Sequence, residues 1–421
     1  MKKLLTVTLF SGLLTLVRMA SGFIIAKVVA VHTGPTGIAM LGQVHSLLST
    51  MNGIVASPAG SGVVRYTAEN NSAGLDTCSL WWKASLNWIT VLFLAVFLAV
   101  FLFAKSLAQW ALGNQEYSWL VIVAAISLPL SVAGTLIGSV INGQENYRRF
   151  VSLGMISVVL STCVMVFLII QYQLDGALLS AALFTSISGL IMLLGSINQP
   201  WFKLKYWWGK ADKVHLKNIG GYVAMAITSA ATVPVSLVLV RNILVDKVGW
   251  EQAGHWQAVY KISEVYLGVI TIALSTYFLP KLATLKDSQS ILLEIKNTAK
   301  IVMPIVITMA IIVYFLRDFA ISVLFTEAFR PARDLFAIQL VGDVIKILAW
   351  LYAYPMLSHG ATKLFIFSEV FFSISFVLLT FMLVNIYGVD GANISYVANY
   401  AIYFIFVFIT ANKAIYFKKL L

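Results

Sequence analysis

The chain has few of the residues that build disulfide frameworks, metal sites or soluble catalytic centres. Its 421 residues include two cysteines, five histidines and 17 acidic residues. Cys78 lies near a predicted cytoplasmic loop and Cys163 in the middle of an apolar segment, so no disulfide framework is implied. No Cys/His spacing typical of a zinc site occurs either. The patterns HExxH and GxxxxGK[ST] are also missing. We therefore predict no catalytic residue, no metal site and no cofactor.

Charge is scarce, whereas apolar residues dominate. Charged residues make up 11% of the chain and hydrophobic residues 60%, with a mean hydropathy of +0.89. Only helices and closed barrels satisfy their backbone in lipid, and these apolar runs are too long for barrel strands. The sequence thus predicts an all-α integral membrane protein with twelve transmembrane helices. The predicted segments are roughly 4–30, 38–66, 80–107, 117–141, 150–171, 175–198, 219–243, 253–279, 298–316, 334–356, 362–386 and 391–415.

The distribution of lysine and arginine predicts the orientation. The 29 basic residues outnumber the acidic ones and give a net charge of +12. Most of them fall in loops on the same side as the N-terminus, which the positive-inside rule places in the cytoplasm. The first apolar run is longer than a signal-peptide core, so we expect an uncleaved first helix and both termini in the cytoplasm.

The chain divides near its middle. Residues 199–217, QPWFKLKYWWGKADKVHLK, combine aromatic side chains suited to lipid headgroups with lysines suited to an anionic leaflet. Six predicted spans precede this segment and six follow it. We predict an N-terminal lobe at 1–198, a cytoplasmic linker at 199–217 and a C-terminal lobe at 218–421. The linker is either a solvated interface anchor or a specific lipid-binding segment.

A weak internal echo indicates duplication. HTGPTGIAMLGQ (32–43) and KVGWEQAGHWQ (247–257) each place a glycine-containing turn before a helix that carries a glutamine, Gln43 or Gln257. Internal repeats of this kind are common in transporters. Pro58, in SPAGSG (57–62), is the predicted hinge, because small residues flank it; a static kink is the alternative.

Several cations lie inside or at the borders of the apolar segments. A charge within a bilayer is costly and is usually kept where it faces a cavity, a partner or a substrate. Lys27 lies near the end of its segment, so it also has the option of reaching the interface. The predicted anion-binding residues are Arg18, Lys27, Arg65, Arg241, Lys261 and Lys346.

Three carboxylates accompany these cations. Lys261 with Glu264, and Asp343 with Lys346, stand three residues apart and so share a helix face. Each is either a pair that neutralises itself or part of a polar patch that faces the bundle. No basic residue stands three or four positions from Glu369, and we expect Glu369 to pair with Lys346 or to carry a proton. Glu264, Asp343 and Glu369 are the predicted coupling carboxylates.

The segment 317–334, RDFAISVLFTEAFRPARD, has a compact apolar run between charged ends. It is too short to span with those charges, so we expect part of it to lie along the outer membrane face as an interfacial helix. A plain polar connector is the alternative.

Two longer stretches carry a family resemblance. GWEQAGHWQAVYKISEVYLGVITIALSTYFLP (249–280) and LRDFAISVLFTEAFRPARDLFAIQLVGDVIKILAW (316–350) are similar to the Wzx polysaccharide flippases, of the enterobacterial common antigen and O-antigen types. AKVVAVHTGPTGIAMLGQ (26–43) fits as well. The resemblance implies the fold of the multidrug/oligosaccharidyl-lipid/polysaccharide (MOP) exporters, with two pseudo-symmetric six-helix lobes around a central cavity.

The resemblance also implies a function. The expected substrate is an undecaprenyl-diphosphate-linked oligosaccharide, moved by alternating access from the cytoplasmic to the periplasmic leaflet of the bacterial inner membrane. Expected partners are a Wzy-type polymerase and a Wzz-type chain-length regulator, and expected coupling is to a proton or sodium gradient. A drug/cation antiporter of the same superfamily is the alternative, but an excess of embedded cations suits an anionic substrate better. A membrane-bound glycosyltransferase is disfavoured because no large loop with clustered acids occurs.

Overall fold

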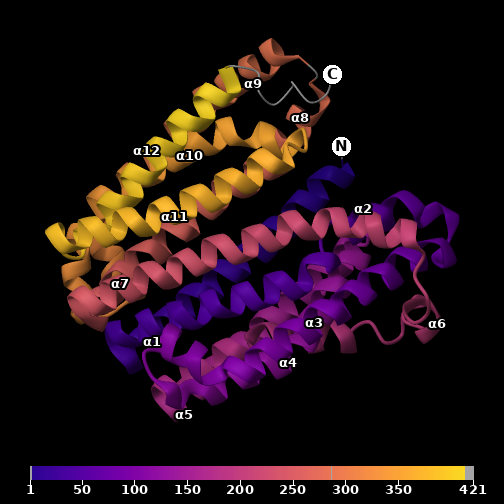
Figure 1. Cartoon of the computed structure of the whole chain (residues 1–421), viewed down its shortest axis with the longest axis horizontal. Coiled ribbons are helices and arrows are strands. Elements are labelled where there is room, and N and C mark those ends of the chain that lie inside the picture. Colours follow the sequence, from indigo (N-terminus) through magenta and orange to yellow (C-terminus); the bar gives the residue numbers. More distant parts are fainter. Residues whose placement is uncertain (1, 286, 413–421) are drawn as a thin grey trace. The chain divides into compact units, whose positions relative to one another are not determined.

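The computed structural model describes residues 2–285 and 287–412, and every regular element in this part of the chain is a helix (Figure 1). Within it, nine helical stretches are long and apolar enough to cross a membrane. The prediction of an all-α, multi-pass membrane protein is confirmed. Residues 413–421, which we predict on the cytoplasmic side, lie outside the described residues.

The helices belong to two compact units. Unit 1 comprises Met1–Thr33 and Met40–Val235, and unit 2 comprises Gly34–Ala39 and Ser236–Leu421. The predicted lobe limits stay a prediction. The two units differ from them because residues 218–235 belong to unit 1 and residues 34–39 to unit 2. The elements are α1 (Lys2–Ala56), η1 (Ser57–Ala59), α2 (Ser61–Asn70), η2 (Asn71–Ala73), α3 (Leu75–Leu112), η3 (Gln115–Tyr117), α4 (Ser118–Gly143), α5 (Tyr147–Leu194), α6 (Leu204–Trp207), α7 (Lys213–Ala273), the π-helix η4 (Leu274–Phe278), α8 (Leu279–Thr284), α9 (Ser288–Leu324), η5 (Glu327–Leu335), α10 (Phe336–Ser358), α11 (Thr362–Tyr387) and α12 (Asp390–Asn412).

Three long helices are broken between two predicted spans by a single non-helical residue, and α3 is kinked inside one predicted span at Phe103 (φ −114°, ψ 18°). The breaks are Gly34 in α1 (φ 64°, ψ −164°), Gln173 in α5 (φ 50°, ψ −119°) and Gly249 in α7 (φ 85°, ψ 166°). Each lies where the sequence predicts a gap between two spans. Counting the arms of α1, α5 and α7 separately gives the predicted twelve helices, although this count stays a prediction.

The two echoing segments share their backbone geometry. Gly34 and Gly249 both combine a positive φ with an extended ψ, a conformation that glycine adopts without steric cost. In each case the chain leaves one helical arm and enters another within one residue. This likeness supports the internal duplication inferred from the sequence.

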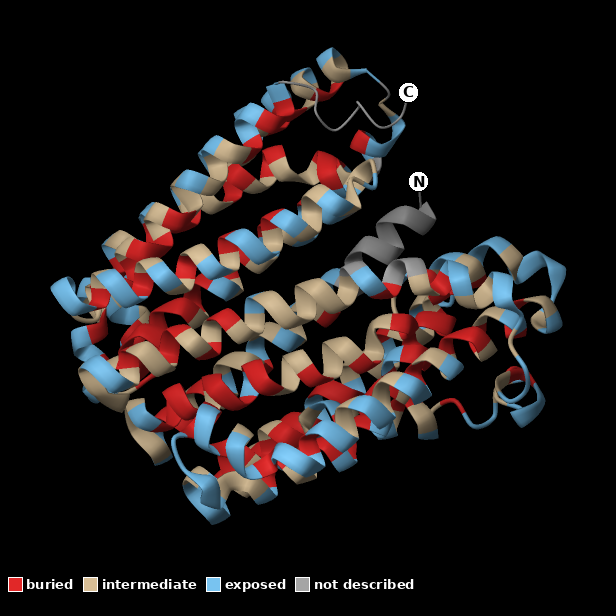
Figure 2. Cartoon of the chain, viewed as in Figure 1, coloured by how far each residue is buried: buried red, intermediate tan, exposed pale blue. Residues whose placement is uncertain are grey.

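The core of unit 1 rests on small residues where α4 meets α5. The Ser186 hydroxyl donates to the Ser127 carbonyl at 2.8 Å, and a Cβ at Gly189 would overlap the Leu130 carbonyl oxygen. Small residues let membrane helices approach closely, so contact between backbones replaces interdigitating side chains here. Buried positions mark this region in Figure 2.

Gly189→Ala is therefore expected to destabilise the protein. Overpacking a tight contact costs about 1–3 kcal/mol. The measurement is the thermal unfolding midpoint of the detergent-solubilised protein. Gly268→Ala is the matched control, because a Cβ at Gly268 meets nothing within 4 Å. Equal midpoints for the two variants would contradict the close approach.

The interfacial helix expected in 317–334 stays a prediction, and the structure divides this segment between two helices. Helix α9 continues without a break to Leu324, so the exposed Phe319 and Val323 belong to its last turns. The charges of Arg317 and Asp318 suggested a helix end at this point. The helix continues past them, and Asp318 forms an ion pair with Arg333 at 3.3 Å. The short helix that follows, η5, buries Phe329 inside unit 2.

Residues around Pro58 interrupt the chain between α1 and α2. Pro58 is buried in η1, and its carbonyl accepts a hydrogen bond from the Ser85 hydroxyl at 2.8 Å. The break expected from SPAGSG is present. A hinge role for Pro58 stays a prediction, and any motion there has to release this bond to α3.

Candidate functional site

The most buried of the predicted site residues is Asp343 in α10. It is 0% exposed and accepts hydrogen bonds from the hydroxyls of Tyr266 at 2.6 Å and Tyr396 at 2.9 Å, and from the amide of Gln339 at 3.1 Å. The Ser263 hydroxyl is a further donor. One carboxylate thus ties α10 to α7 and α12. Because both carboxylate oxygens accept hydrogen bonds from protein donors, its burial is stabilised by the protein itself.

Lys346 stands one turn further along α10 but is not a donor to Asp343. Its ammonium lies 5.0 Å from the ring centre of Trp350, 5.3 Å from Tyr400 and 5.6 Å from Tyr396. It acts on Asp343 only electrostatically. The hypothesis of a self-neutralised Asp343–Lys346 pair is therefore corrected. The tyrosine hydroxyls occupy the carboxylate, and the lysine is held by aromatic faces, which attract cations.

Arg241 is almost fully buried, 2% exposed, in the first arm of α7. Its Nε donates to Gln257 Oε1 at 2.7 Å across the Gly249 break, and the two partners are 16 residues apart in sequence. Lys27 and Gln43, the corresponding residues of the echo, are also 16 residues apart across Gly34. Gln43 is buried like Gln257, and Lys27 is half-buried. Each copy of the echo thus has a cation before its turn and a glutamine after it.

Lys261 and Glu264 form the predicted ion pair in the second arm of α7. Their charged atoms are 3.2 Å apart, and the side chains are 43% and 41% exposed. Glu264 also interacts electrostatically with the buried Arg241, and Tyr260 is buried next to the pair in sequence. We call the resulting group the unit-2 polar cluster. It consists of Arg241, Gln257, Tyr260, Lys261, Ser263, Glu264, Tyr266, Gln339, Asp343, Lys346, Trp350, Tyr396 and Tyr400.

Helix α10 positions this cluster. It packs chiefly against α12 and α9, and its buried residues include Asp343 and Ile347, one turn apart. Buried positions run along α10 in Figure 2. Three of the predicted cations and two of the predicted carboxylates are brought together in this way.

The remaining predicted residues lie elsewhere. Arg18 is exposed and Lys27 half-buried in the first arm of α1, nine residues apart and so on different sides of the helix. Arg65 in α2 is 58% exposed and pairs with Glu69 at 2.8 Å. Glu369 in α11 is half-buried, and its pairing with Lys346 stays a prediction.

Sequence reasoning missed the aromatic residues of the cluster. Tyr396, Tyr400 and Tyr403 recur at helical spacing in α12, so they share one face of an apolar helix. A hydroxyl-bearing stripe of this kind is a signal for a buried acceptor on a neighbouring helix. His255 is structural, since its Nε2 lies 2.9 Å from the Ala328 carbonyl and fixes η5 to α7. No group of His, Cys, Asp and Glu that would hold a metal occurs among the described residues.

Comparisons with known proteins agree with this picture. Residues 61–334 match the model of a family described as polysaccharide biosynthesis protein. The lipid III flippases of Escherichia coli (strain K12) and Shigella flexneri are each 30% identical over 407 residues, which cover 94% of this chain and 95% of theirs.

Solved structures share the fold at low sequence identity. An inward-facing multidrug resistance MATE transporter of the MOP superfamily has a TM-score of 0.77, at 15% identity, with 96% of this chain and 94% of that chain covered. The lipid II flippase MurJ in an inward closed conformation has a TM-score of 0.72, at 13% identity, with 97% and 87% covered. The MOP exporter fold expected from the sequence is confirmed. The two relatives are named as flippases, which are transporters and not enzymes. Through its match over residues 61–334 and its full-length similarity to these flippases, the chain belongs to the polysaccharide biosynthesis protein family.

Proposed function

We propose that this chain is a flippase that moves undecaprenyl-diphosphate-linked oligosaccharides from the cytoplasmic to the periplasmic leaflet by alternating access. The full-length similarity to proteins named lipid III flippases supports the transport of a lipid-linked glycan. The repeat unit is that of enterobacterial common antigen or a related O-antigen. A diphosphate carries negative charge through the low-dielectric part of the membrane, so the protein has to supply cations along the path.

The observation that carries the proposal is that the ammonium group of Lys346 lies against aromatic rings and, among the described residues, not against a carboxylate. Its neighbour Asp343 is fully occupied by tyrosine, glutamine and serine donors, whereas the lysine rests on aromatic rings. Aromatic faces stabilise an ammonium group without neutralising it. Its charge therefore remains available to phosphate oxygens through charge-assisted hydrogen bonds. A cation-exporting antiporter would need the opposite arrangement, with free carboxylates.

We assign the cations two kinds of role, direct contact with the diphosphate and a contribution to the positive potential around it. Lys346 and the half-exposed Lys261 are the first contacts for the diphosphate, and the buried Arg241 holds Gln257 and adds positive potential. Arg18, Lys27 and Arg65 extend the positive path in unit 1. If transport is coupled to a proton or sodium gradient, Glu264 and Glu369 are better candidates than Asp343 to bind the ion. Asp343 would have to lose several hydrogen bonds in order to bind a proton or a sodium ion.

The cellular setting follows from this proposal. The protein resides in the bacterial inner membrane with both termini in the cytoplasm. The exported repeat unit passes to a Wzy-type polymerase that works with a Wzz-type chain-length regulator.

Lys261→Ala is expected to lower glycan export without lowering stability. A half-exposed pair three residues apart contributes only about 0–1 kcal/mol to folding, whereas loss of the cation removes a phosphate contact. Lys261→Arg should retain most of the activity. The measurement is surface glycan per molecule of membrane-inserted protein. Unchanged export by the alanine variant would remove Lys261 from the site.

The function itself is tested by complementation. In a strain without its own lipid III flippase, the wild-type chain should restore surface glycan and clear accumulated undecaprenyl-linked intermediate. The same cells are tested for tolerance to cationic drugs. Drug tolerance without glycan rescue would favour the antiporter and contradict the proposal.

A further inference from the structure

We propose that residues 203–217 form a binding site for anionic lipid headgroups, with Leu204 and Trp208 inserted into the membrane interface. This site is separate from the unit-2 polar cluster, and the inference does not depend on the transported substrate. It lies in unit 1, in the connection from α5 through α6 to the start of α7 (Figure 1).

Part of this segment is fixed inside the protein. Trp201 and Tyr206 are only 2% and 8% exposed. Trp207 stacks on the buried Trp82 of α3 at 5.2 Å between ring centres, and its indole N–H donates to the Trp201 carbonyl at 3.0 Å. The expectation that the aromatic side chains of this segment lie at headgroup level is therefore wrong for Trp201 and Tyr206, which pack inward. The segment is held in place by these contacts.

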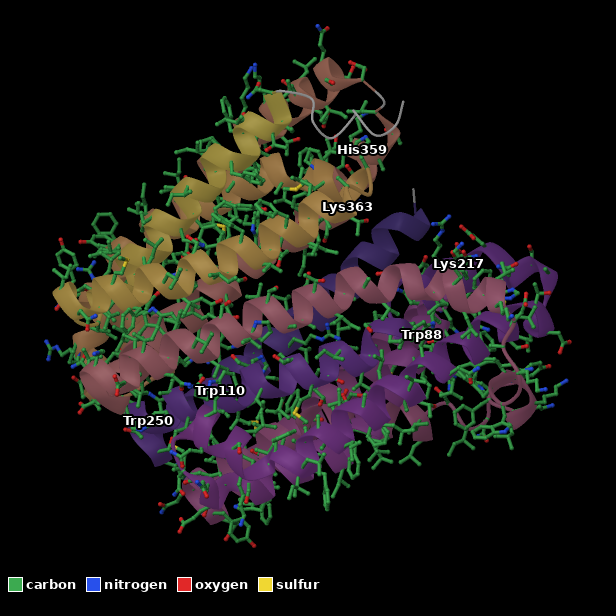
Figure 3. The ribbon with its side chains drawn as sticks, viewed as in Figure 1. Trp88, Trp110, Lys217, Trp250, His359 and Lys363 are labelled. Carbon is green, nitrogen blue, oxygen red and sulfur yellow. The ribbon has the colours of Figure 1, made fainter. Side chains whose placement is uncertain are left out.

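The start of α7 is fixed to the same helix. The indole N–H of Trp88 in α3 donates to the Leu216 carbonyl at 3.0 Å, and Lys217 lies nearby (Figure 3). Ile219 and Val223 pack with Ala84 in a buried apolar core. Both ends of the segment are thus tied to α3, so the residues that face outward are presented by a rigid support.

Two large apolar side chains face outward from this support. Leu204 is 75% exposed and Trp208 is 74% exposed. They flank the single turn of α6, Leu204 as its first residue and Trp208 directly after its last. Exposed tryptophan is favoured at the membrane interface, where its ring is apolar and its N–H stays hydrated.

Positive charge surrounds these two residues. Five lysines of the segment are exposed, whereas its single acid, Asp212, faces His215 at 3.5 Å. Each lysine near an anionic membrane surface strengthens the attraction to it. A soluble acidic protein would suit the lysines but leaves Leu204 and Trp208 without a role, whereas an anionic lipid surface suits both. The lysines are Lys203, Lys205, Lys210, Lys213 and Lys217.

The first arm of the test measures depth in the membrane. In a Cys163→Ser background, Trp208→Cys and Lys210→Cys are spin-labelled in nanodiscs of phosphatidylcholine with or without phosphatidylglycerol. Cys78 is buried and remains. We expect the label at position 208 to be shielded from a water-soluble relaxation agent and accessible to oxygen in the anionic discs, with the label at 210 in water. Equal access of the water-soluble agent to both positions would overturn the insertion.

The second arm measures the charge dependence. We expect phosphatidylglycerol to raise the thermal midpoint of the wild-type protein relative to phosphatidylcholine alone. Changing Lys203, Lys205, Lys210 and Lys213 together to Gln should remove at least about half of this shift, because it removes most of the local charge. The matched control changes four other exposed lysines to Gln. They are Lys281, Lys296, Lys300 and Lys363.

Each result of the second arm decides between alternatives. A shift that falls only in the first quadruple variant supports a local lipid site. An equal fall in both variants means that general surface charge is responsible, and it overturns the proposal. A wild-type midpoint that does not respond to phosphatidylglycerol overturns it as well.

Discussion

Asp343→Ala is expected to destabilise unit 2 more than any other single change in the polar cluster. The variant leaves the hydroxyls of Tyr266 and Tyr396 and the amide of Gln339 without their acceptor in the interior. Each buried polar group that loses its partner costs about 1–3 kcal/mol, so a total of at least about 3 kcal/mol is expected. The measurement is the unfolding midpoint in detergent, with Glu264→Ala as the control.

Conservative variants separate this structural role from a coupling role. Tyr266→Phe and Tyr396→Phe each remove one donor and leave the carboxylate with others, so each should cost less than Asp343→Ala. The loss of stability in Asp343→Asn should be larger than in the two Tyr→Phe variants and smaller than in Asp343→Ala, because the new NH₂ group faces hydrogen-bond donors while the remaining carbonyl oxygen still accepts. A folded Asp343→Ala protein with a wild-type midpoint would show that the hydrogen bonds do not hold the cluster together. A stable Asp343→Asn variant that transports without an ion gradient would restore Asp343 as a coupling group.

Lys346→Met is expected to give the largest loss of transport without unfolding. Methionine fills a similar volume among the rings of Trp350, Tyr396 and Tyr400 but carries no charge. A hydrogen bond to a charged group contributes about 1.5–3 kcal/mol, so affinity for an undecaprenyl diphosphate should fall about 10-fold or more. Lys346→Arg keeps the cation and its attraction to the rings and should retain part of the activity.

Lys247→Met is the matched control for Lys346. Lys247 also lies over an aromatic ring, that of Phe381 at 5.9 Å, but it has a carboxylate neighbour, Asp246, at 3.9 Å. Its loss should leave transport unchanged. Binding is measured with the purified variants, and thermal midpoints confirm that both are folded. Equal losses in the two lysine variants would contradict a specific role for Lys346.

Much of the fold was predictable from the sequence because hydropathy and turn residues act locally. The long apolar runs gave the spans, and the glycines of the echo fell at the breaks Gly34 and Gly249. The end of α9 was not predictable in this way. The charges of Arg317 and Asp318 suggested a helix end, but a partner distant in sequence, Arg333, allows the helix to continue.

The sequence indicated which charged residues to examine for the candidate site, but it did not indicate the hydrogen-bond partners of Asp343. Burial cost alone identified Arg241, Lys261 and Lys346, because intramembrane cations need a reason to persist. The partner of Asp343 was inferred from helical spacing, which favoured Lys346. The actual donors Tyr266 and Tyr396 come from other helices, 77 and 53 residues away in sequence. Packing between helices decides such partners, and a single sequence does not encode it in local spacing.

The most direct test of the account is the movement of a fluorescent undecaprenyl-diphosphate oligosaccharide across proteoliposomes that contain the purified chain. Wild-type protein should move the lipid between leaflets, Lys247→Met should match it, and Lys346→Met should be slower by about 10-fold or more. Movement no faster than in protein-free liposomes, or equal movement by all three proteins, would contradict the claim that a cation of the unit-2 polar cluster carries the diphosphate.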